Sequence, residues 1–289
     1  MTLRSTFSRL FSAKPQASGG PSRKLISRRA PKAGDAPESD VDPFWIGLID
    51  DVREGLYNFD NKELAPGMPI SPEDVVADIG CGEGGAASFC VRCGAHTVLI
   101  DSDSDVIGQA VAKAAAAGPG RAEGRVGDAQ AVPLPDAFAS RVICMEVLEH
   151  VDDPKAVMTE LLRVGRPGAL YLISVPGQVA EGLHKRVAPA YYFEKPNHVR
   201  IFEREAFERL IEESGLVIER RLRYGFFWTL YWLFFFEHDV QFGEKSHPLL
   251  DAWARTWDEV LKSKHSEQIR AGLQDIAPRS IAVVARKPG

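Results

Sequence analysis

Cysteine is scarce in this chain of 289 residues, and that scarcity excludes a fold held together by a disulfide framework. The chain contains only Cys81, Cys90, Cys93 and Cys144. Cys90 and Cys93 have the C-x-x-C spacing of zinc ligands, but no second pair of ligands at similar spacing accompanies them. We therefore expect the cysteines to be reduced and packed in the core of a cytoplasmic protein, and we expect no metal site.

Long hydrophobic runs are also missing. No run reaches the ~18 apolar residues that cross a bilayer, and the N-terminus lacks the apolar core of a secretory signal. Residues 1–34 contain eight Arg or Lys and no acid, whereas the rest contains 27 basic and 40 acidic residues. An acidic body disfavours nucleic acid as a partner. We expect residues 1–40 to be a disordered basic arm, although this composition also resembles an organellar targeting peptide.

From residue 74 onward, short apolar runs alternate with helical patterns. This alternation predicts an α/β fold with a Rossmann-like, doubly wound, largely parallel sheet and helices on both faces. Residues 176–200 are expected to form a long connection, and 41–289 a single domain with a helical, aromatic-rich insertion at about 225–278. The expected strands are 75–79, 97–101, a short strand that contains 125–126, 141–145, 170–175, 216–224 and 280–285. The expected helices are 42–57, 85–92, 103–117, 153–166, 203–214, 249–262 and 266–275.

A glycine-rich turn follows the first expected strand. Gly80, Gly82 and Gly85 match the G-x-G-x-x-G pattern, which taken alone also fits a dinucleotide site. Asp78 precedes the first of these glycines by two residues. A carboxylate there would repel a pyrophosphate but attract an ammonium or a sulfonium, and S-adenosylmethionine (SAM) carries both cations.

Two more carboxylates follow the next expected strands. Asp101 ends the second strand, where it could accept hydrogen bonds from ribose hydroxyls of either cofactor. Asp128 follows the third strand and could accept from an adenine amino group. Each of these acids alone is typical of a solvated loop. Their shared place at the carboxyl ends of successive strands favours one nucleoside site.

Taken together, these motifs resemble the class I SAM-dependent methyltransferases, in particular the group that acts mostly on small molecules and lipids. The matching stretches are 76–84, 99–101, 127–129, 146–151 and 162–168. The resemblance implies a seven-stranded sheet whose last strand is antiparallel and lies beside the fifth. It also implies SAM as cofactor and a set of binding residues. These are Asp78, Gly80, Cys81, Gly82, Gly84, Asp101, Ser102, Asp128, Ala129 and Glu146.

Histidines are the candidates for proton transfer. Methyl transfer is an in-line displacement that depends mainly on orientation, so no catalytic residue is obligatory, but a hydroxyl acceptor benefits from a general base. His150 lies in the motif after the fourth expected strand, and His198 lies in the connection after the fifth. We name both as candidate bases and His184 as a weaker one. A purely structural role, fixing a loop, is an open alternative for each. Tyr191 and Tyr192 could line a substrate pocket or simply pack.

Eight of the 26 aromatic residues lie in the run Phe226–Phe236. The favoured interpretation is a core helix that caps the sheet edge, because so dense an apolar run must be covered. A lid over a hydrophobic substrate, docking on a membrane surface and self-association are the alternatives.

The sequence therefore predicts a SAM-dependent methyltransferase for a small-molecule or lipid-like acceptor. Three other functions stay open: a non-catalytic SAM-binding or interaction protein, an NAD-dependent oxidoreductase and an RNA methyltransferase. The carboxylates beside the glycine turn disfavour the oxidoreductase, and the acidic body disfavours the RNA enzyme.

Overall fold

The computed structural model describes residues 41–238 and 247–289, so the expected basic arm at 1–40 lies outside the described residues. The strands are β1 Val75–Ile79, β2 His96–Asp101, β3 Arg121–Val126, β4 Ala139–Met145, β5 Gly165–Pro176, β6 Val217–Tyr224 and β7 Ser280–Arg286. The helices are α2 Pro43–Arg53, α3 Gly85–Arg92, α4 Ser104–Ala115, α5 Pro154–Val164, α6 Gln178–His184, a short 3₁₀ helix Ala190–Phe193, α7 Arg204–Glu213, α8 Phe226–Glu237, α9 Pro248–Lys262 and α10 Ser266–Ile276.

The strands form one seven-stranded sheet in the order β3-β2-β1-β4-β5-β7-β6. β1 is parallel to both β2 and β4, whereas β7 is antiparallel to both β5 and β6. This order confirms the predicted sheet and its antiparallel last strand beside the fifth. The chain runs outward from β1 to β3 and then returns to place β4 on the other side of β1. In such sheets, ligands bind at the carboxyl ends of the strands where the direction switches.

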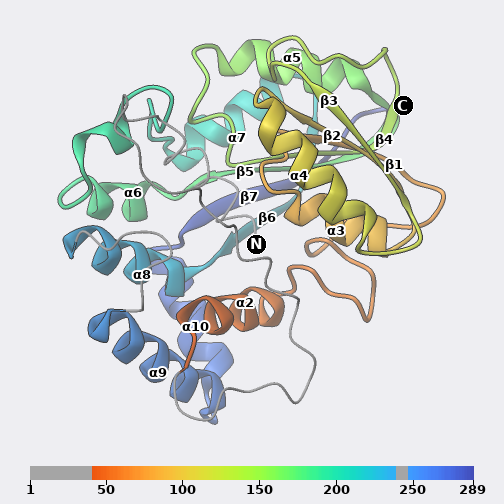
Figure 1. The fold of residues 1–289 in the computed structure, drawn as a ribbon. Coiled ribbons are helices and arrows are strands. Elements are labelled where there is room, and N and C mark those ends of the chain that lie inside the picture. Colours follow the sequence, from red (N-terminus) through yellow and green to blue (C-terminus); the bar gives the residue numbers. More distant parts are fainter. Residues whose placement is uncertain (1–40, 239–246) are drawn as a thin grey trace, which may run out of the picture.

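Helices cover both faces of the sheet (Figure 1). α5 and α7 pack with one face, in a core cluster that contains Ala77, Val142 and Tyr171. α3 packs on the opposite face, in a cluster with Val76 and Ile143. Successive strand residues thus enter opposite cores, as the two-residue period of a strand requires. The cysteines behave as expected, because Cys90 and Cys93 are buried in the second cluster and none of the four cysteines forms a disulfide.

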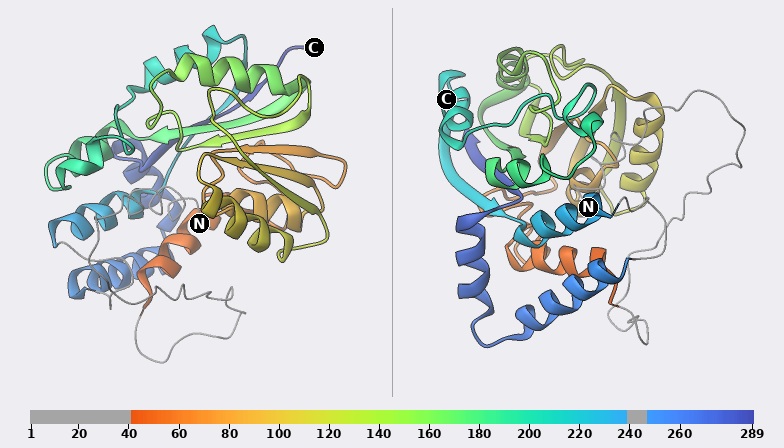
Figure 2. Two further views of the ribbon diagram at one scale, coloured as in Figure 1. Left: turned by 45° about the horizontal axis from the view of Figure 1, so that its top comes forward. Right: turned by 90° about the vertical axis from the view of Figure 1, so that its left-hand side faces the viewer.

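A helical cap, made of α2, α8, α9 and α10, packs beside the β6 edge (Figures 1 and 2). Arg270 of α10 donates to Asp50 of α2 at 2.6 Å, and both side chains are buried. The indole N–H of Trp228 donates to the buried carboxylate of Asp51 at 3.2 Å. Polar contacts therefore join α2 to two helices that come much later in the chain, across 177 residues to α8 and 220 residues to α10.

The aromatic run forms α8, and every residue of Phe226–Phe236 is buried or half-buried. Its rings pack with Phe44 of α2 and with Trp253 and Trp257 of α9. This confirms the favoured interpretation of a buried core helix. Within residues 41–238 and 247–289, none of the helices combines the length and apolarity needed to span a membrane.

The structure changes some of the expected bounds. The first helix ends at Arg53 rather than near residue 57, because Gly55 has a φ of +86° and turns the chain. The third strand contains the expected 125–126 but begins at Arg121, and its mixture of half-buried and exposed residues gives no apolar run that would mark this start. The expected connection 176–200 contains α6 and the 3₁₀ helix.

Candidate active site

The glycine turn lies between β1 and α3, at the carboxyl edge of the sheet. Gly80, Gly82 and Gly84 have φ values of +70°, +49° and +73°, which residues with a Cβ adopt at a cost. A Cβ on Gly80 would lie 2.4 Å from the side chain of Val147 in the loop after β4. The turn thus touches the β4 loop directly, so the two candidate site segments form one surface.

Asp101 braces this turn from the end of β2. Its carboxylate accepts the N–H of Gly82 at 3.0 Å and that of Asp103 at 3.2 Å. Its backbone carbonyl accepts the N–H of Gly127 at 2.9 Å, which brings in the segment after β3. Asp101 is 1% exposed. One residue therefore ties together the ends of three neighbouring strands.

Asp78 lies beneath the turn and is 3% exposed. Burial raises the pKa of its carboxyl to about 7; the backbone N–H of Ala87 opposes this shift, and the charge of Asp101 adds to it. One carboxyl oxygen, Oδ2, has no hydrogen-bond partner within the described part of the chain. A cationic ligand would favour the ionised form of this carboxyl.

The remaining predicted contacts are more varied. Asp128 is exposed and its carboxylate accepts the N–H of Gln130 at 2.8 Å, so it also shapes its own turn. Ala129 beside it is half-buried, and Ser102 is exposed next to Asp101. The side chain of Cys81 belongs to a hydrophobic cluster under α3 and α4, so Cys81 can offer a ligand its backbone only.

Glu146 terminates β4 with a φ of +55°, an uncommon conformation for a residue other than glycine. Its carboxylate accepts from the hydroxyl of Ser174 at 2.9 Å and lies 3.6 Å from the guanidinium of Arg279. Burial raises the pKa of Glu146, while Arg279 and Ser174 oppose the shift. The side chain is 5% exposed at the same sheet edge as the glycine turn.

Behind Glu146 lies a buried polar cluster that the sequence did not reveal. Arg279, which is 1% exposed, lies between Glu146 and Glu181, with a guanidinium nitrogen 3.8 Å from the Glu181 carboxylate. Glu181 of α6 also accepts from the hydroxyl of Tyr192 at 3.2 Å. Arg279 and Glu181 are about 100 residues apart, and neither belongs to a recognisable motif. Only the pairing of β5 with β7 brings them together.

The two candidate bases lie side by side. The imidazole rings of His150 and His198 are 4.9 Å apart, and the carboxylate of Glu149 adjoins both. Nδ1 of His198 is 2.7 Å from Glu181, and Nδ1 of His150 is 3.2 Å from the carbonyl of Pro196. Burial raises the pKa of Glu149 well above its usual value, and the charge of Glu146 adds to the shift. Glu149 was visible in the sequence motif, but only its neighbour His150 was considered.

The weaker candidate, His184, adjoins the same polar cluster, with its Nδ1 3.6 Å from the carboxylate of Glu181. It is fully buried at the end of α6, and its Nε2 is 2.9 Å from the carbonyl of Thr229 in α8. Burial lowers its pKa, and the adjoining Glu181 carboxylate opposes this shift. His184 thus joins α6 to the helical cap, the structural alternative that the sequence left open. Tyr191 is exposed, whereas Tyr192 is buried against His198.

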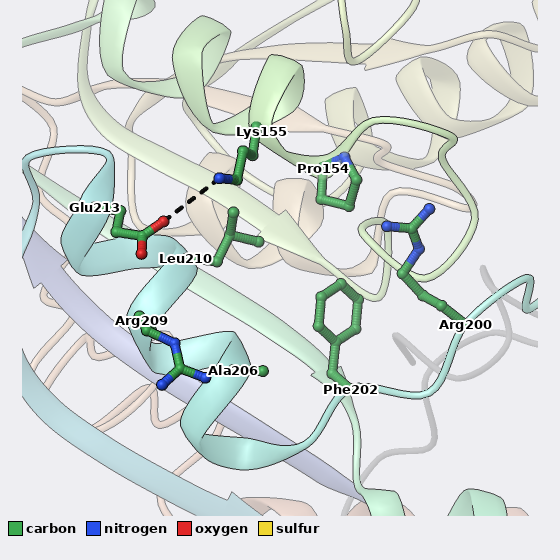
Figure 3. Close-up of a pocket in the computed structure, with 8 residues that line it drawn as sticks. All are labelled: Pro154, Lys155, Arg200, Phe202, Ala206, Arg209, Leu210 and Glu213. Carbon is green, nitrogen blue, oxygen red and sulfur yellow. Dashed lines mark ion pairs between the residues drawn. The ribbon is translucent and has the colours of Figure 1, made fainter.

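An open groove of about 370 Å³ lies elsewhere, between α5 and α7 (Figure 3). Its lining includes Arg200, Phe202 and an ion pair between Lys155 and Glu213 at 3.6 Å. None of the predicted site residues lines it. We therefore place the candidate site at the strand ends and not in this groove.

Comparisons with known proteins identify the family of the chain. A family model described as a methyltransferase domain matches residues 50–220. A "probable S-adenosylmethionine-dependent methyltransferase" of Mycolicibacterium smegmatis is 31% identical over 147 residues, which are 51% of this chain and 53% of that protein. A ubiquinone biosynthesis O-methyltransferase of Aeromonas salmonicida is 29% identical over 189 residues, 63% of this chain and 73% of that one. The chain thus spans about half the length of the first relative.

Solved structures share the fold. A geranyl diphosphate methyltransferase in complex with SAM superposes with a TM-score of 0.55 at 16% identity, covering 88% of this chain and 93% of that one. The family model and the SAM-dependent relative resolve the two interpretations of the glycine motif in favour of the SAM-binding family over the dinucleotide enzymes. The family model covers more than half of the sequence, and the chain belongs to the SAM-dependent methyltransferases.

Proposed function

We propose that this protein transfers a methyl group from SAM to a hydroxyl oxygen of a small-molecule or lipid-like acceptor. The observation that carries the proposal is the meeting of two groups of residues at one sheet edge. The carboxylates and glycines of a nucleoside site lie at the ends of β1 and β2, and the histidine pair lies in the loops that follow β4 and β5.

The residues of the glycine turn fit the cofactor. The absence of side chains at Gly80, Gly82 and Gly84 lets the methionine part of the cofactor approach the backbone. In this proposal, Asp101 holds the ribose hydroxyls, and Asp128 with Ala129 holds the adenine. The carboxylates of Asp78 and Glu146 attract a cofactor that carries an ammonium and a sulfonium.

When bound, SAM supplies an electrophilic methyl group on sulfur. The protein then has to hold the acceptor in line with that bond, and orientation of this kind contributes roughly 7–11 kcal/mol in favourable cases. A hydroxyl acceptor must also lose its proton. His150 and His198 adjoin the loop that carries Glu146, so either imidazole can take that proton. General-base catalysis of this kind raises the rate about 10²–10⁴-fold.

The surroundings of the histidines favour an apolar or aromatic acceptor. The rings of Tyr192 and Phe193 lie 4.5 Å and 6.5 Å from the imidazole of His198, and Tyr192 continues into the aromatic core of the helical cap. Relatives named for ubiquinone biosynthesis and for tocopherol are O-methyltransferases, and a third relative is an N-methyltransferase for norajmaline. A hydroxyl acceptor has to give up a proton to a base, and His150 and His198 can serve as that base. We therefore favour oxygen as the acceptor atom.

The test is turnover of the full chain with SAM labelled in its methyl group. The acceptor panel comprises catechols and hydroquinones, each with and without a prenyl tail, and a matched set of aliphatic amines. We expect label to appear on oxygen in a tailed phenol, and an Asp101→Ala variant to lose this activity. SAM binding without transfer to any member of the panel would instead favour the non-catalytic alternative.

A further inference from the structure

Three side chains that can bind a metal converge beside Glu146. Glu149 and His150 come from the loop after β4, and His198 comes from the connection after β5. One ligand atom of each lies within 4.8 Å of those of the other two. The three residues are 49 positions apart at most, and only folding places them at one point.

Glu149 is 1% exposed, and neither of its carboxyl oxygens has a hydrogen-bond partner among the described residues. Its position is nevertheless fixed, because its backbone carbonyl accepts the N–H of Val199 at 2.9 Å. A buried carboxylate is normally satisfied by donors, by a cation or by a metal. Here the metal-binding groups next to it are two imidazoles, and the charge of the buried Arg279 also acts on it.

The hydrogen bonds of the imidazoles determine which nitrogen each presents. Nδ1 of His198 is 2.7 Å from the Glu181 carboxylate, and Nδ1 of His150 is 3.2 Å from the Pro196 carbonyl. A carbonyl can only accept, and a carboxylate accepts here, so each Nδ1 carries the proton. In a neutral ring, Nε2 then bears the lone pair. Nε2 of His150 lies 3.6 Å from Glu149, and Nε2 of His198 is buried in the same place.

Histidines that bind metals usually have this arrangement, in which the second ring nitrogen donates to a carboxylate or a backbone carbonyl. We propose that Glu149, His150 and His198 bind one divalent transition-metal ion, with Glu181 and the Pro196 carbonyl orienting the two imidazoles. Two imidazoles and one carboxylate suit Zn²⁺, Mn²⁺ or Fe²⁺, and three protein ligands leave coordination positions open.

Glu149 and His150 lie in the loop that begins at Glu146, next to the sheet edge where methyl transfer is proposed, and this part of the inference rests on the proposed function. With a metal bound, the Nε2 lone pairs of both imidazoles serve as ligands, so the metal replaces the histidines as the group that activates the acceptor. A hydroxyl oxygen of the acceptor occupies an open position, and the positive charge lowers the pKa of that hydroxyl. Its proton leaves to the solvent, and an oxygen lone pair forms the new C–O bond. The C–S bond of the cofactor breaks, and its electron pair stays on sulfur.

Metal binding is tested on the full chain, stripped with a chelator and then dialysed against Zn²⁺ or Co²⁺. We expect one equivalent of metal per chain and a visible absorption of bound Co²⁺. Glu149→Gln and His198→Gln should each weaken binding by at least about tenfold, and Glu181→Gln by about 10–100-fold through loss of ligand orientation. His96→Gln is the matched control, because His96 pairs with Glu123 at 3.2 Å on the sheet without a third ligand.

Circular dichroism and the melting temperature of each metal-free variant establish that it is folded. A folded wild-type chain that takes up no metal would overturn the proposal. Glu149, His150 and His198 would then interact with one another only by sharing protons. Uptake that stays unchanged in folded Glu149→Gln and His198→Gln variants would overturn it as well. If metal binds but no acceptor is methylated, the metal site stands and the proposed function fails. Methyl transfer that survives complete removal of bound metal would overturn only the catalytic role of the metal.

Discussion

Gly80→Ala is the perturbation whose effect the structure determines best. The new Cβ would sit on a backbone with a φ of +70° and lie 2.4 Å from Cγ2 of Val147. The left-handed conformation costs an alanine about 1–2 kcal/mol, and overpacking of a buried site costs roughly 1–3 kcal/mol. We therefore expect a loss of about 2–5 kcal/mol in the free energy of unfolding, which for a domain of this size lowers the melting temperature by roughly 4–20 °C.

The same variant should lose SAM affinity, because the turn can relieve the clash only by moving away from Val147. Gly108→Ala is the matched control. Gly108 lies in α4 at ordinary φ, and a Cβ there meets no atom within 4 Å. Alanine should stabilise that helix position by about 0.5–1 kcal/mol and leave SAM binding intact.

Calorimetric melting and SAM titration of the two variants measure both effects. Adding Val147→Ala to Gly80→Ala should recover the part of the loss that comes from the clash, so the two substitutions should be non-additive. The reasoning would be refuted if Gly80→Ala melted and bound SAM like the wild type, or if Gly80→Ala and Gly108→Ala shifted stability in the same direction.

Three further predictions follow from charged groups. Asp101→Asn should weaken SAM binding by about 10–100-fold in a calorimetric titration, since hydrogen bonds to charged groups contribute roughly 1.5–3 kcal/mol. Asp105 is exposed, so Asp105→Asn should leave SAM binding unchanged. SAM binding should tighten by about tenfold from pH 6 to pH 8, because the Asp78 carboxyl has a pKa of about 7 and a cationic cofactor favours the ionised carboxylate. In an Asp78→Asn variant, SAM affinity should no longer change over this pH range. Arg270→Leu should lower the free energy of unfolding in urea by about 3–5 kcal/mol, because it leaves the buried Asp50 unpaired, and a change below 1 kcal/mol would contradict that role.

Much of the sheet could be predicted because its central strands are recognisable in the sequence. β1, β2, β4 and β5 are buried apolar runs that end in a glycine or a charged residue, so their place and type followed from composition. β3 could not be delimited in this way, since an edge strand of alternating exposure has no apolar run. α6 was missed because a helix of seven residues between loops gives too short a period to recognise.

The cofactor edge could be predicted for a different reason. Asp78, Asp101 and the glycines are local signals, and parallel strands necessarily bring their carboxyl ends together. The polar cluster behind Glu146 is not local. Arg279 reaches Glu181 only through the pairing of β7 with β5, and no sequence spacing encodes that contact. The same holds for His150 and His198, which the sequence offered as separate bases and the fold places 4.9 Å apart.

The central claim is that carboxylates around a glycine turn select a cationic nucleoside, and calorimetric titration of the full chain tests it most directly. SAM, its demethylated product and NAD would be titrated under identical conditions. The account predicts one binding site per chain for SAM and for its demethylated product, and no heat of binding for NAD. Saturable binding of NAD together with no binding of SAM would contradict it.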